Sequence, residues 1–301
     1  MSCLEVFFEK AKLVADSNQQ IAHIVLPEGE DERIVEGAIK VVEQGLAKIT
    51  LLGNVDKVSA LIAKAGGQPD AFNLIDPNNA ASNSSMLARF LELRKGKVSE
   101  ENAKQAVLET LVFGNLMVEM GEADGSIAGA IHTTGDTVRT AFQIIGKGEG
   151  VSSVSSFFLM GLDKERHGRD DTLVFSDCAL MIEPDSQQLA DIGIASADSF
   201  KKMLSIEPQV AMLSFSTKGS AKHNAVTKVE EAVQIANKAR PDLAIDGEMQ
   251  FDAAFIKSVG SSKAPNSKVA GNANVFVFPN LEAGNIGYKI AQRLGGLSAT
   301  G

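Results

Sequence analysis

Short apolar runs alternate with amphipathic helical patterns along most of the chain, and this alternation constrains the fold more than any other feature. The runs that predict strands cover residues 21–26, 49–53, 72–76, 126–130, 151–162, 173–175, 210–214, 243–246 and 275–278. Helical spacing predicts helices over residues 31–43, 55–65, 86–95, 99–120, 137–145, 186–203, 225–239 and 284–294. Because such alternation implies right-handed crossovers, we expect an α/β fold with mostly parallel sheets covered on both faces. The runs at 151–162 and 173–175 are joined closely and are expected to pair antiparallel.

The composition excludes several classes of protein. With 44% hydrophobic and 22% charged residues among 301, the chain is typical of a soluble globular protein of one large or two ordinary domains. A net charge of −9 argues against nucleic acid, which needs a basic face. No apolar run approaches the ~20 residues of a membrane span, and residues 1–20 predict an amphipathic helix, not a signal peptide. Two isolated cysteines, Cys3 and Cys178, fit a reducing compartment, so we expect a cytoplasmic protein.

The first candidate binding loop lies between the predicted strand at 126–130 and the predicted helix at 137–145. It holds His132, Thr133, Thr134, a glycine and Asp136. A loop that leads from a strand into a helix directs free backbone N–H groups at whatever lies above the strand end, which favours an anion. Arg139, in the first turn of the helix, adds a fixed positive charge. The alternative is an ordinary strand–helix turn capped by Thr134 or Asp136.

The second candidate loop, residues 214–222, directly follows the predicted strand at 210–214. It combines the hydroxyls of Ser216, Thr217 and Ser220 with a glycine and two lysines, Lys218 and Lys222. These are groups that a phosphate needs, although the spacing of a Walker A loop is missing and no dinucleotide-binding glycine motif is present. The alternative is a plain surface loop. Ligands of α/β proteins gather at strand ends, so two such loops strengthen the prediction of an anion site.

Several other polar residues allow both a chemical and a structural interpretation. Asp246, Glu248 and Asp252 follow a predicted strand; they can hold a metal or transfer protons, but we favour helix caps and ion pairs. Asp177 also follows a strand and is a candidate to line a cleft. Cys178 is a weak nucleophile candidate because no partner histidine is identifiable. His23 is interpreted as a satisfied core histidine, and Lys289 with Arg293 as a solvated basic face.

Taken together, the motifs of this chain resemble the phosphate acetyltransferase (phosphotransacetylase) family. The stretches that carry the resemblance follow the family order and are residues 26–33 (LPEGEDER), 92–95 (ELRK), 129–139 (GAIHTTGDTVR), 176–178 (SDC), 210–220 (VAMLSFSTKGS), 245–247 (IDG), 262–265 (SKAP) and 278–285 (FPNLEAGN). The resemblance implies reversible transfer of an acetyl group between acetyl phosphate and coenzyme A. Phosphate butyryltransferase is a close relative and stays an alternative.

The resemblance also implies an architecture. We expect two α/β domains like those of the isocitrate/isopropylmalate dehydrogenase fold, with the active site in the cleft between them. The glycine-rich residues 147–150 place the boundary: residues 1–147 form the first domain, to which 296–301 return, and residues 148–295 form the second. The family further implies a homodimer, no catalytic metal, no tightly bound cofactor, coenzyme A as a substrate and a place in acetate metabolism.

Roles for individual residues follow from the resemblance. Arg139 is the expected catalytic residue, because it would stabilise substrate anions while the coenzyme A thiolate attacks the acyl carbonyl. Arg94 would help to hold coenzyme A. The remaining expected substrate-binding residues are His132, Thr133, Thr134, Ser216, Thr217, Lys218 and Ser220.

The family sequence continues beyond the glycine that matches Gly301, into a motif with a serine, an arginine and a proposed aspartate base. If the protein continues in the same way, we expect an active enzyme; if it ends at Gly301, we expect weak turnover with residual ligand binding. Two other classes stay open. One is a decarboxylating dehydrogenase with magnesium on Asp246, Glu248 and Asp252, and the other is a non-catalytic module that senses acyl-coenzyme A.

Overall fold

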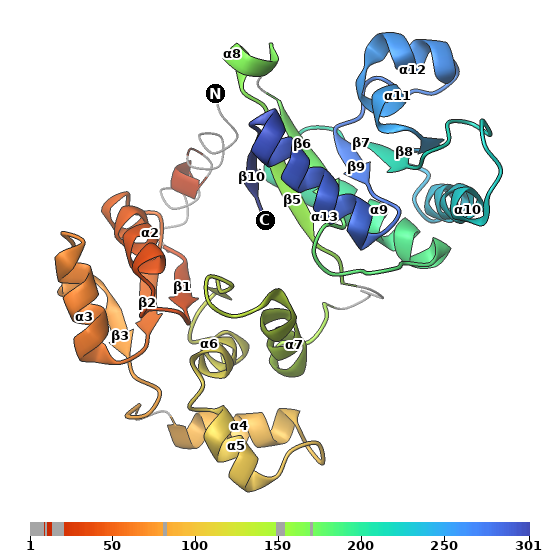
Figure 1. Ribbon diagram of the computed structural model, residues 1–301. Coiled ribbons are helices and arrows are strands. Elements are labelled where there is room, and N and C mark those ends of the chain that lie inside the picture. Colours follow the sequence, from red (N-terminus) through yellow and green to blue (C-terminus); the bar gives the residue numbers. More distant parts are fainter. Residues whose placement is uncertain (1–8, 10, 14–20, 81–82, 149–153, 169–170) are drawn as a thin grey trace. The chain divides into compact units, whose positions relative to one another are not determined.

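The computed structural model describes residues 9, 11–13, 21–80, 83–148, 154–168 and 171–301 (Figure 1). The chain forms two compact units that divide at residues 149–150, close to the expected boundary. We call them the N-terminal unit and the C-terminal unit and describe each by itself. Most of the helix expected over residues 1–20 lies outside the described residues; residues 9 and 11–13 are helical. No helix in the described part of the chain is both long and apolar enough to cross a membrane.

The N-terminal unit is built on a four-stranded parallel sheet in the order β3-β2-β1-β4. Its strands are β1 (His23–Leu26), β2 (Lys48–Leu52), β3 (Asn73–Ile75) and β4 (Gly125–Ser126). The helices are α2 (Glu32–Glu43), α3 (Val55–Lys64), α4 (Asn83–Leu93), α5 (Glu100–Ala106), α6 (Thr110–Glu119) and α7 (Thr134–Ile144), with a 3-10 turn at Pro69–Ala71. The predicted parallel α/β arrangement is thus confirmed for this unit.

Alternation along each strand divides the core of the N-terminal unit into two layers. Leu51 packs with the apolar faces of α2 and α3, whereas its neighbour Leu52 packs with residues of α4–α7 such as Phe113. Successive side chains of a strand point to opposite faces, so both faces of the sheet are covered. Asn54 and Ser99 accept backbone N–H bonds at the starts of α3 and α5, which confirms them as the predicted caps.

Two predictions for the N-terminal unit were wrong in detail. The strand expected at 126–130 is only the two residues of β4, and Ile127 beyond it is 59% exposed. The backbone N–H groups of residues 129–132 bond a carboxylate, so they are not available to a strand ladder. The helix expected over 99–120 is divided into α5 and α6, because the chain turns at 107–109, where the N–H groups of Leu108 and Glu109 bond carbonyls three residues back.

The C-terminal unit is built on a six-stranded sheet in the order β10-β5-β6-β9-β7-β8. Its strands are β5 (Phe157–Gly161), β6 (Thr172–Ser176), β7 (Gln209–Leu213), β8 (Ala244–Met249), β9 (Val275–Val277) and β10 (Ser298–Thr300). β6, β9, β7 and β8 are parallel, and β5 pairs with β6 antiparallel as predicted.

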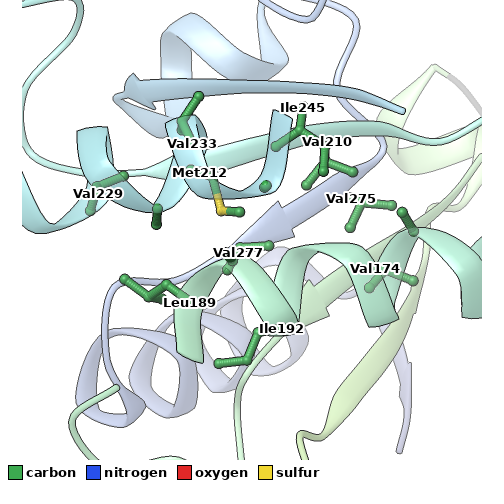
Figure 2. Packing of buried hydrophobic residues seen from close by; sticks show 14 of the residues in the cluster. Val174, Leu189, Ile192, Val210, Met212, Val229, Val233, Ile245, Val275 and Val277 are labelled. Carbon is green, nitrogen blue, oxygen red and sulfur yellow. The ribbon is translucent and has the colours of Figure 1, made fainter. Parts of the chain in front are cut away.

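Helices cover both faces of this second sheet (Figure 1). One face packs against α9 (Ser186–Leu204) and α10 (Asn224–Ala239), where Ile192 and Val229 meet Met212 and Val277 from the strands (Figure 2). The other face packs against α11 (Phe251–Phe255), α12 (Lys257–Lys263) and α13 (Leu281–Ile290), which ends in a π-helical turn at Ala291–Gly295. A short helix, α8 (Lys164–His167), follows β5, and Asp185 caps α9 as predicted.

The expected return of residues 296–301 to the first domain was wrong. These residues contain β10, which pairs antiparallel with β5 in the C-terminal unit. An uncovered edge strand presents unpaired backbone groups, and β10 satisfies those of β5. Leu297 and Ala299 also pack against the core on this side of the sheet.

Candidate functional site

The loop that leads into α7 is held by one buried carboxylate. β1 and β4 are neighbouring parallel strands, so the turn after β1 and the loop after β4 lie at the same edge of the sheet. Glu28, in the first turn, is 3% exposed. Its Oε2 accepts N–H bonds from Gly129 and Ala130 at 2.9 and 2.8 Å, and its Oε1 accepts those of Ile131 and His132 at 2.8 and 2.7 Å. The N–H groups expected to be free for a ligand are therefore occupied at residues 129–132.

The charge of Glu28 is stabilised strongly by this arrangement. Burial opposes ionisation, but the backbone N–H bonds from His132, Ile131 and Ala130 and the bond from the His132 ring outweigh it, so the pKa of Glu28 is lowered to about 2. Nδ1 of His132 lies 2.9 Å from Glu28 Oε1. Arg33 also crosses to this loop and donates to the carbonyl of Ala130 at 2.7 Å.

The start of α7 keeps donors for an anion. Thr133 is the N-cap and accepts the N–H of Asp136 at 3.1 Å, so the alternative caps Thr134 and Asp136 were wrong. Thr134 and Gly135 are exposed, and their N–H groups have no hydrogen-bond partner among the described residues. Such N–H groups at the start of a helix bind anions. Arg139 is 64% exposed and pairs with Asp136 across one helical turn, so most of its donors face solvent.

Arg94 lies directly after α4, where the chain turns with Lys95, Gly96 and Lys97. Arg94 is half-buried, its own N–H bonds the carbonyl of Phe90, and its guanidinium has no partner within the part of the chain that the structure describes. This turn therefore presents a cationic group at the end of a helix, where the helix dipole favours positive charge.

The second candidate loop is tied to the end of β8. Ser216 and Thr217 are 0% and 5% exposed. The hydroxyl of Ser216 donates to the carboxylate of Glu248 at 2.8 Å, and the backbone N–H of Gly219 donates to the same oxygen at 2.9 Å. Thr217 Oγ1 accepts the backbone N–H of Gln250 at 2.9 Å. β7 and β8 are neighbouring parallel strands, so the loop after β7 lies beside the end of β8. The bonds between them fix the shape of the loop.

Lys218 and Ser220 lie on the exposed part of this loop. The ammonium of Lys218 pairs with Asp246 and donates to the carbonyl of Gly247 at 2.6 Å. The hydroxyl of Ser220 accepts the N–H of Thr217 at 3.0 Å. The backbone of Lys218 is in the left-handed region, with φ of 49°. The loop is thus a hydrogen-bonded, partly exposed turn with two cations, Lys218 and Lys222, at its surface.

The three carboxylates expected to follow a strand are used structurally, as we favoured, but Asp246 and Glu248 lie within β8 itself and only Asp252 follows it. Asp246 pairs with Lys218, Glu248 accepts the bonds described above, and Asp252 pairs with Lys263 at 3.2 Å. In the described ranges, no group of three or more histidine, cysteine or acidic side chains is placed to hold a metal ion.

Asp177 and Cys178, after β6, also turn inward. Asp177 is 2% exposed and accepts N–H bonds from Ser156, Ala179, Leu180 and Met181. It therefore anchors two turns and does not line an open surface. Burial, together with the charge of Asp177, raises the pKa of the Cys178 thiol well above its usual range, so this thiol is a poor nucleophile.

The remaining predicted residues behave largely as expected. The ring of His23 is satisfied as expected, because its Nε2 lies 2.7 Å from Thr50 Oγ1, but the residue is only half-buried and is not part of the core. Lys289 and Arg293 are exposed on and after α13, with no acidic partner among the described residues.

A hollow of about 520 Å³ lies at the carboxyl ends of β2 and β3 in the N-terminal unit. Asp56 and Asp76 line it together with Asn54 and Asn79. Two carboxylates repel the phosphate groups of an anionic substrate, so this hollow is less suited to one than the start of α7.

The nine expected site residues are shared between the units. Arg94, His132, Thr133, Thr134 and Arg139 belong to the N-terminal unit, and Ser216, Thr217, Lys218 and Ser220 to the C-terminal unit. The active-site cleft expected between the domains stays a prediction. Our sequence reasoning missed Glu28, because only the order of strands in the sheet shows that the strand before it is the neighbour of the strand before the candidate loop.

Comparison with known proteins gives consistent results. A sequence model of the family described as phosphate acetyl/butaryl transferase matches residues 4–301. Phosphate acetyltransferase from Bacillus subtilis is 49% identical, over 92% of this chain and 84% of the relative. The enzyme of that name from Thermoanaerobacterium thermosaccharolyticum is 45% identical, over 100% and 90%. The structure of a phosphotransacetylase from Streptococcus pyogenes matches with a TM-score of 0.90 and 44% identity, over 100% of this chain and 89% of that one.

Proposed function

The chain belongs to the phosphate acetyl/butaryl transferase family, and we propose that it transfers an acetyl group reversibly between acetyl phosphate and coenzyme A. The observation that carries this proposal is identity of 45–49% to phosphate acetyltransferases over nearly the whole chain. The free N–H groups at the start of α7 support it, because they suit the phosphate that both directions of the reaction require.

The start of α7 is the proposed phosphate site. The N–H groups of Thr134 and Gly135 and the exposed guanidinium of Arg139 offer donors at one helix end, where the helix dipole also favours negative charge. Thr133 shapes this end as the N-cap. A coenzyme A phosphate is assigned to Arg94, whose guanidinium is free of partners among the described residues.

The proposed acetyl transfer moves negative charge from sulfur to the acyl oxygen and then to phosphate. The coenzyme A thiol loses its proton, and the thiolate sulfur attacks the carbonyl carbon of acetyl phosphate. A tetrahedral oxyanion forms and collapses, the bond from the acyl carbon to the phosphate oxygen breaks, and phosphate leaves. Arg139 is the proposed catalytic residue, because a fixed cation stabilises negative charge that grows on the oxyanion and the leaving phosphate.

We propose two roles for the loop after β7. Ser216 and Thr217 are buried and act by holding the loop. Lys218 and Ser220 are exposed and are the proposed substrate contacts. Lys218 would have to share its ammonium between Asp246 and the substrate, which three donors permit.

We propose that the protein acts on small molecules in the cytoplasm. Coenzyme A is a proposed substrate, and no tightly bound cofactor is proposed. The dehydrogenase alternative is less well supported, because the carboxylates that it requires for magnesium are engaged with Lys218, Ser216 and Lys263. Turnover distinguishes an enzyme from a module that only senses acyl-coenzyme A.

Initial rates with acetyl, propionyl and butyryl phosphate test the proposal. With coenzyme A and the chain extended through the serine, arginine and aspartate motif that follows Gly301 in the family, we expect thioester formation without added metal or nicotinamide cofactor, with acetyl phosphate as the best substrate. A clear preference for butyryl phosphate would reassign the chain within its family. Binding of acetyl-coenzyme A with no turnover of any acyl phosphate would contradict an enzymatic function.

Replacement of Arg139 by glutamine tests the catalytic assignment. Loss of a charged donor to the developing oxyanion is expected to lower kcat about 10²-fold. Arg240→Gln is the matched control, because Arg240 is another surface arginine paired with acidic residues, Asp198 and Asp242, and has no assigned role. Equal rates for Arg139→Gln and the unchanged protein would remove Arg139 from the mechanism.

A homodimer is the proposed assembly, and an exposed apolar stripe on α13 and its π-helical turn supports it. Ile286, Ile290 and Leu294 are 58%, 53% and 76% exposed. The first two lie four residues apart and share one face of α13. Exposed apolar residues in a row are characteristic of protein–protein contacts, and a second copy of the chain is the partner that the family implies.

A further inference from the structure

Lys218 has a backbone conformation that is unfavourable for a lysine. Its φ is 49°, in the left-handed region, where the Cβ of an L-residue crowds the neighbouring backbone. Gly219 follows in the same region with φ of 80°. A residue other than glycine keeps such a conformation only where its surroundings hold it, and such residues concentrate at functional sites. The conformation therefore indicates that the side chain of Lys218 has a role.

Contacts from β8 hold the backbone of this turn. The N–H of Lys218 donates to the carbonyl oxygen of Glu248 at 3.1 Å, and the N–H of Gly219 donates to the carboxylate of the same residue at 2.9 Å. Glu248 is 2% exposed, so these bonds are largely shielded from water. The main chain at Lys218 is thus fixed relative to β8.

Two acceptors within β8 also place the ammonium of Lys218. It pairs with Oδ1 of Asp246 and donates to the carbonyl oxygen of Gly247 at 2.6 Å. These are its two partners in the described ranges of the chain. An ammonium has three donors, so one is left for a ligand, and the side chain is 37% exposed.

Asp246 is itself held on both of its carboxylate oxygens. Its Oδ1 also accepts the backbone N–H of Gly247 at 2.8 Å, and its Oδ2 accepts the hydroxyl of Ser267. The hydroxyl oxygen of Ser267 accepts the N–H of Ala270 at 3.0 Å, which anchors it in the turn after α12. The carboxylate is therefore fixed by contacts other than its pair with Lys218.

We propose that Asp246 is a positioning residue for the acetyl transfer: it holds the ammonium of Lys218 so that the remaining donor meets the phosphoryl group of acetyl phosphate. This inference rests on the proposed function, in which Lys218 contacts the substrate. Asp246 supplies geometry and takes no part in the transfer of a proton. A free lysine side chain loses much rotamer entropy when it binds a ligand, and a side chain that is already ordered loses less. Asp246 therefore favours binding of the acyl phosphate.

Initial rates of Asp246→Asn test the proposal in the chain extended through the motif that follows Gly301 in the family. We expect the KM for acetyl phosphate to rise about tenfold, with kcat and the KM for coenzyme A changed less than about threefold. Glu207→Gln is the matched control, because Glu207 pairs with Lys201 at 2.7 Å on the surface of the same unit. A lowered KM for acetyl phosphate in Asp246→Asn would overturn the proposal, because it would show that the carboxylate competes with the substrate for Lys218.

A double-mutant cycle distinguishes positioning of Lys218 from a general effect on the fold. In a Lys218→Met background no ammonium is left to position, so Asp246→Asn is expected to change the KM for acetyl phosphate less than about twofold further. A rise of about tenfold in both backgrounds would overturn the proposal, because Asp246 would then act independently of Lys218.

Calorimetric titration of the same four proteins with inorganic phosphate needs no turnover and separates this inference from the proposed function. We expect Asp246→Asn to weaken phosphate binding when Lys218 is present and to leave it unchanged in Lys218→Met. An additive result in a protein that turns over acetyl phosphate overturns the role of Asp246 and leaves the acetyltransferase proposal intact. An unchanged protein that neither turns over acetyl phosphate nor binds phosphate overturns both.

A second variant keeps the proposal testable if Asp246→Asn does not fold. Ser267→Ala removes the hydroxyl that holds Oδ2 of Asp246 and leaves the charge of the carboxylate in place. We expect the KM for acetyl phosphate to rise about threefold in Ser267→Ala and to stay unchanged when the same substitution is made in Lys218→Met. An equal KM for Ser267→Ala and the unchanged protein would then overturn the proposal.

Discussion

Glu28, Asp177 and Glu248 share one structural device at the scale of single residues. Each is a buried carboxylate at or just after the end of a strand, and each accepts N–H bonds from the backbone of a neighbouring turn. A buried charge is tolerated only when it is hydrogen-bonded in this way. The loops at the carboxyl ends of both sheets are thus held from within, and their remaining exposed donors are available to a ligand.

The stability of the protein is expected to depend on the ionisation of Glu28. Its pKa is about 2 in the folded protein, against an ordinary value of 4.5. Because the folded pKa is the lower one, the stabilisation is complete above about pH 4.5 and is lost as the pH falls towards about 2. The shift corresponds to about 3 kcal/mol.

Denaturant unfolding as a function of pH measures this dependence. The difference in unfolding free energy between the unchanged protein and Glu28→Gln should be largest at neutral pH and should shrink between about pH 4.5 and 2. A difference that stays constant over this range would show that Glu28 does not titrate in the folded protein as its contacts indicate.

At the scale of elements, the position of α13 depends on a close backbone contact. A side chain at Gly284 would overlap the carbonyl oxygen of Asp177, so this glycine lets α13 pack directly on the turn after β6. Asn285, the next residue, donates to the carbonyl of Cys178 at 3.0 Å. The helix that carries the apolar stripe is therefore fixed by the same turn that Asp177 anchors.

Gly284→Ala is expected to lower the unfolding free energy by about 2 kcal/mol, because the added methyl group displaces α13 from that turn. Gly37→Ala is the matched control in α2. A Cβ there meets nothing within 4 Å, so the same substitution should stabilise that helix by roughly 0.5–1 kcal/mol. Thermal unfolding of both variants measures the effects, and an unchanged midpoint for Gly284→Ala would contradict the close packing.

At the scale of the whole molecule, the apolar stripe of Ile286, Ile290 and Leu294 is the proposed contact with a second copy. Sedimentation is expected to show a dimer, and Ile290→Glu to shift it to the monomer, because a charge at the centre of an apolar contact is costly. Ile206→Glu replaces another exposed isoleucine, 51% exposed beyond α9, and should leave the dimer intact. A dimer unaffected by Ile290→Glu would place the interface elsewhere.

Much of the fold could be predicted because the signals are local. The period of the apolar residues predicted most strands and helices. Asn54, Ser99 and Asp185 marked helix starts, because each side chain caps an N–H group only three residues further along the chain. The antiparallel pairing of β5 and β6 followed from their short connection. The two loops at strand ends were found from their hydroxyl groups and glycines, although their ligand roles stay predictions.

The sequence by itself thus determined the alternation of elements, their caps and the family. Only the tertiary structure decided which of the loop donors are free. Glu28 reaches N–H groups that lie 101–104 residues further along the chain, and β10 joins β5 across more than a hundred residues. A pattern within one segment carries no information about such partners, because they meet only when separate strands take neighbouring places in a sheet.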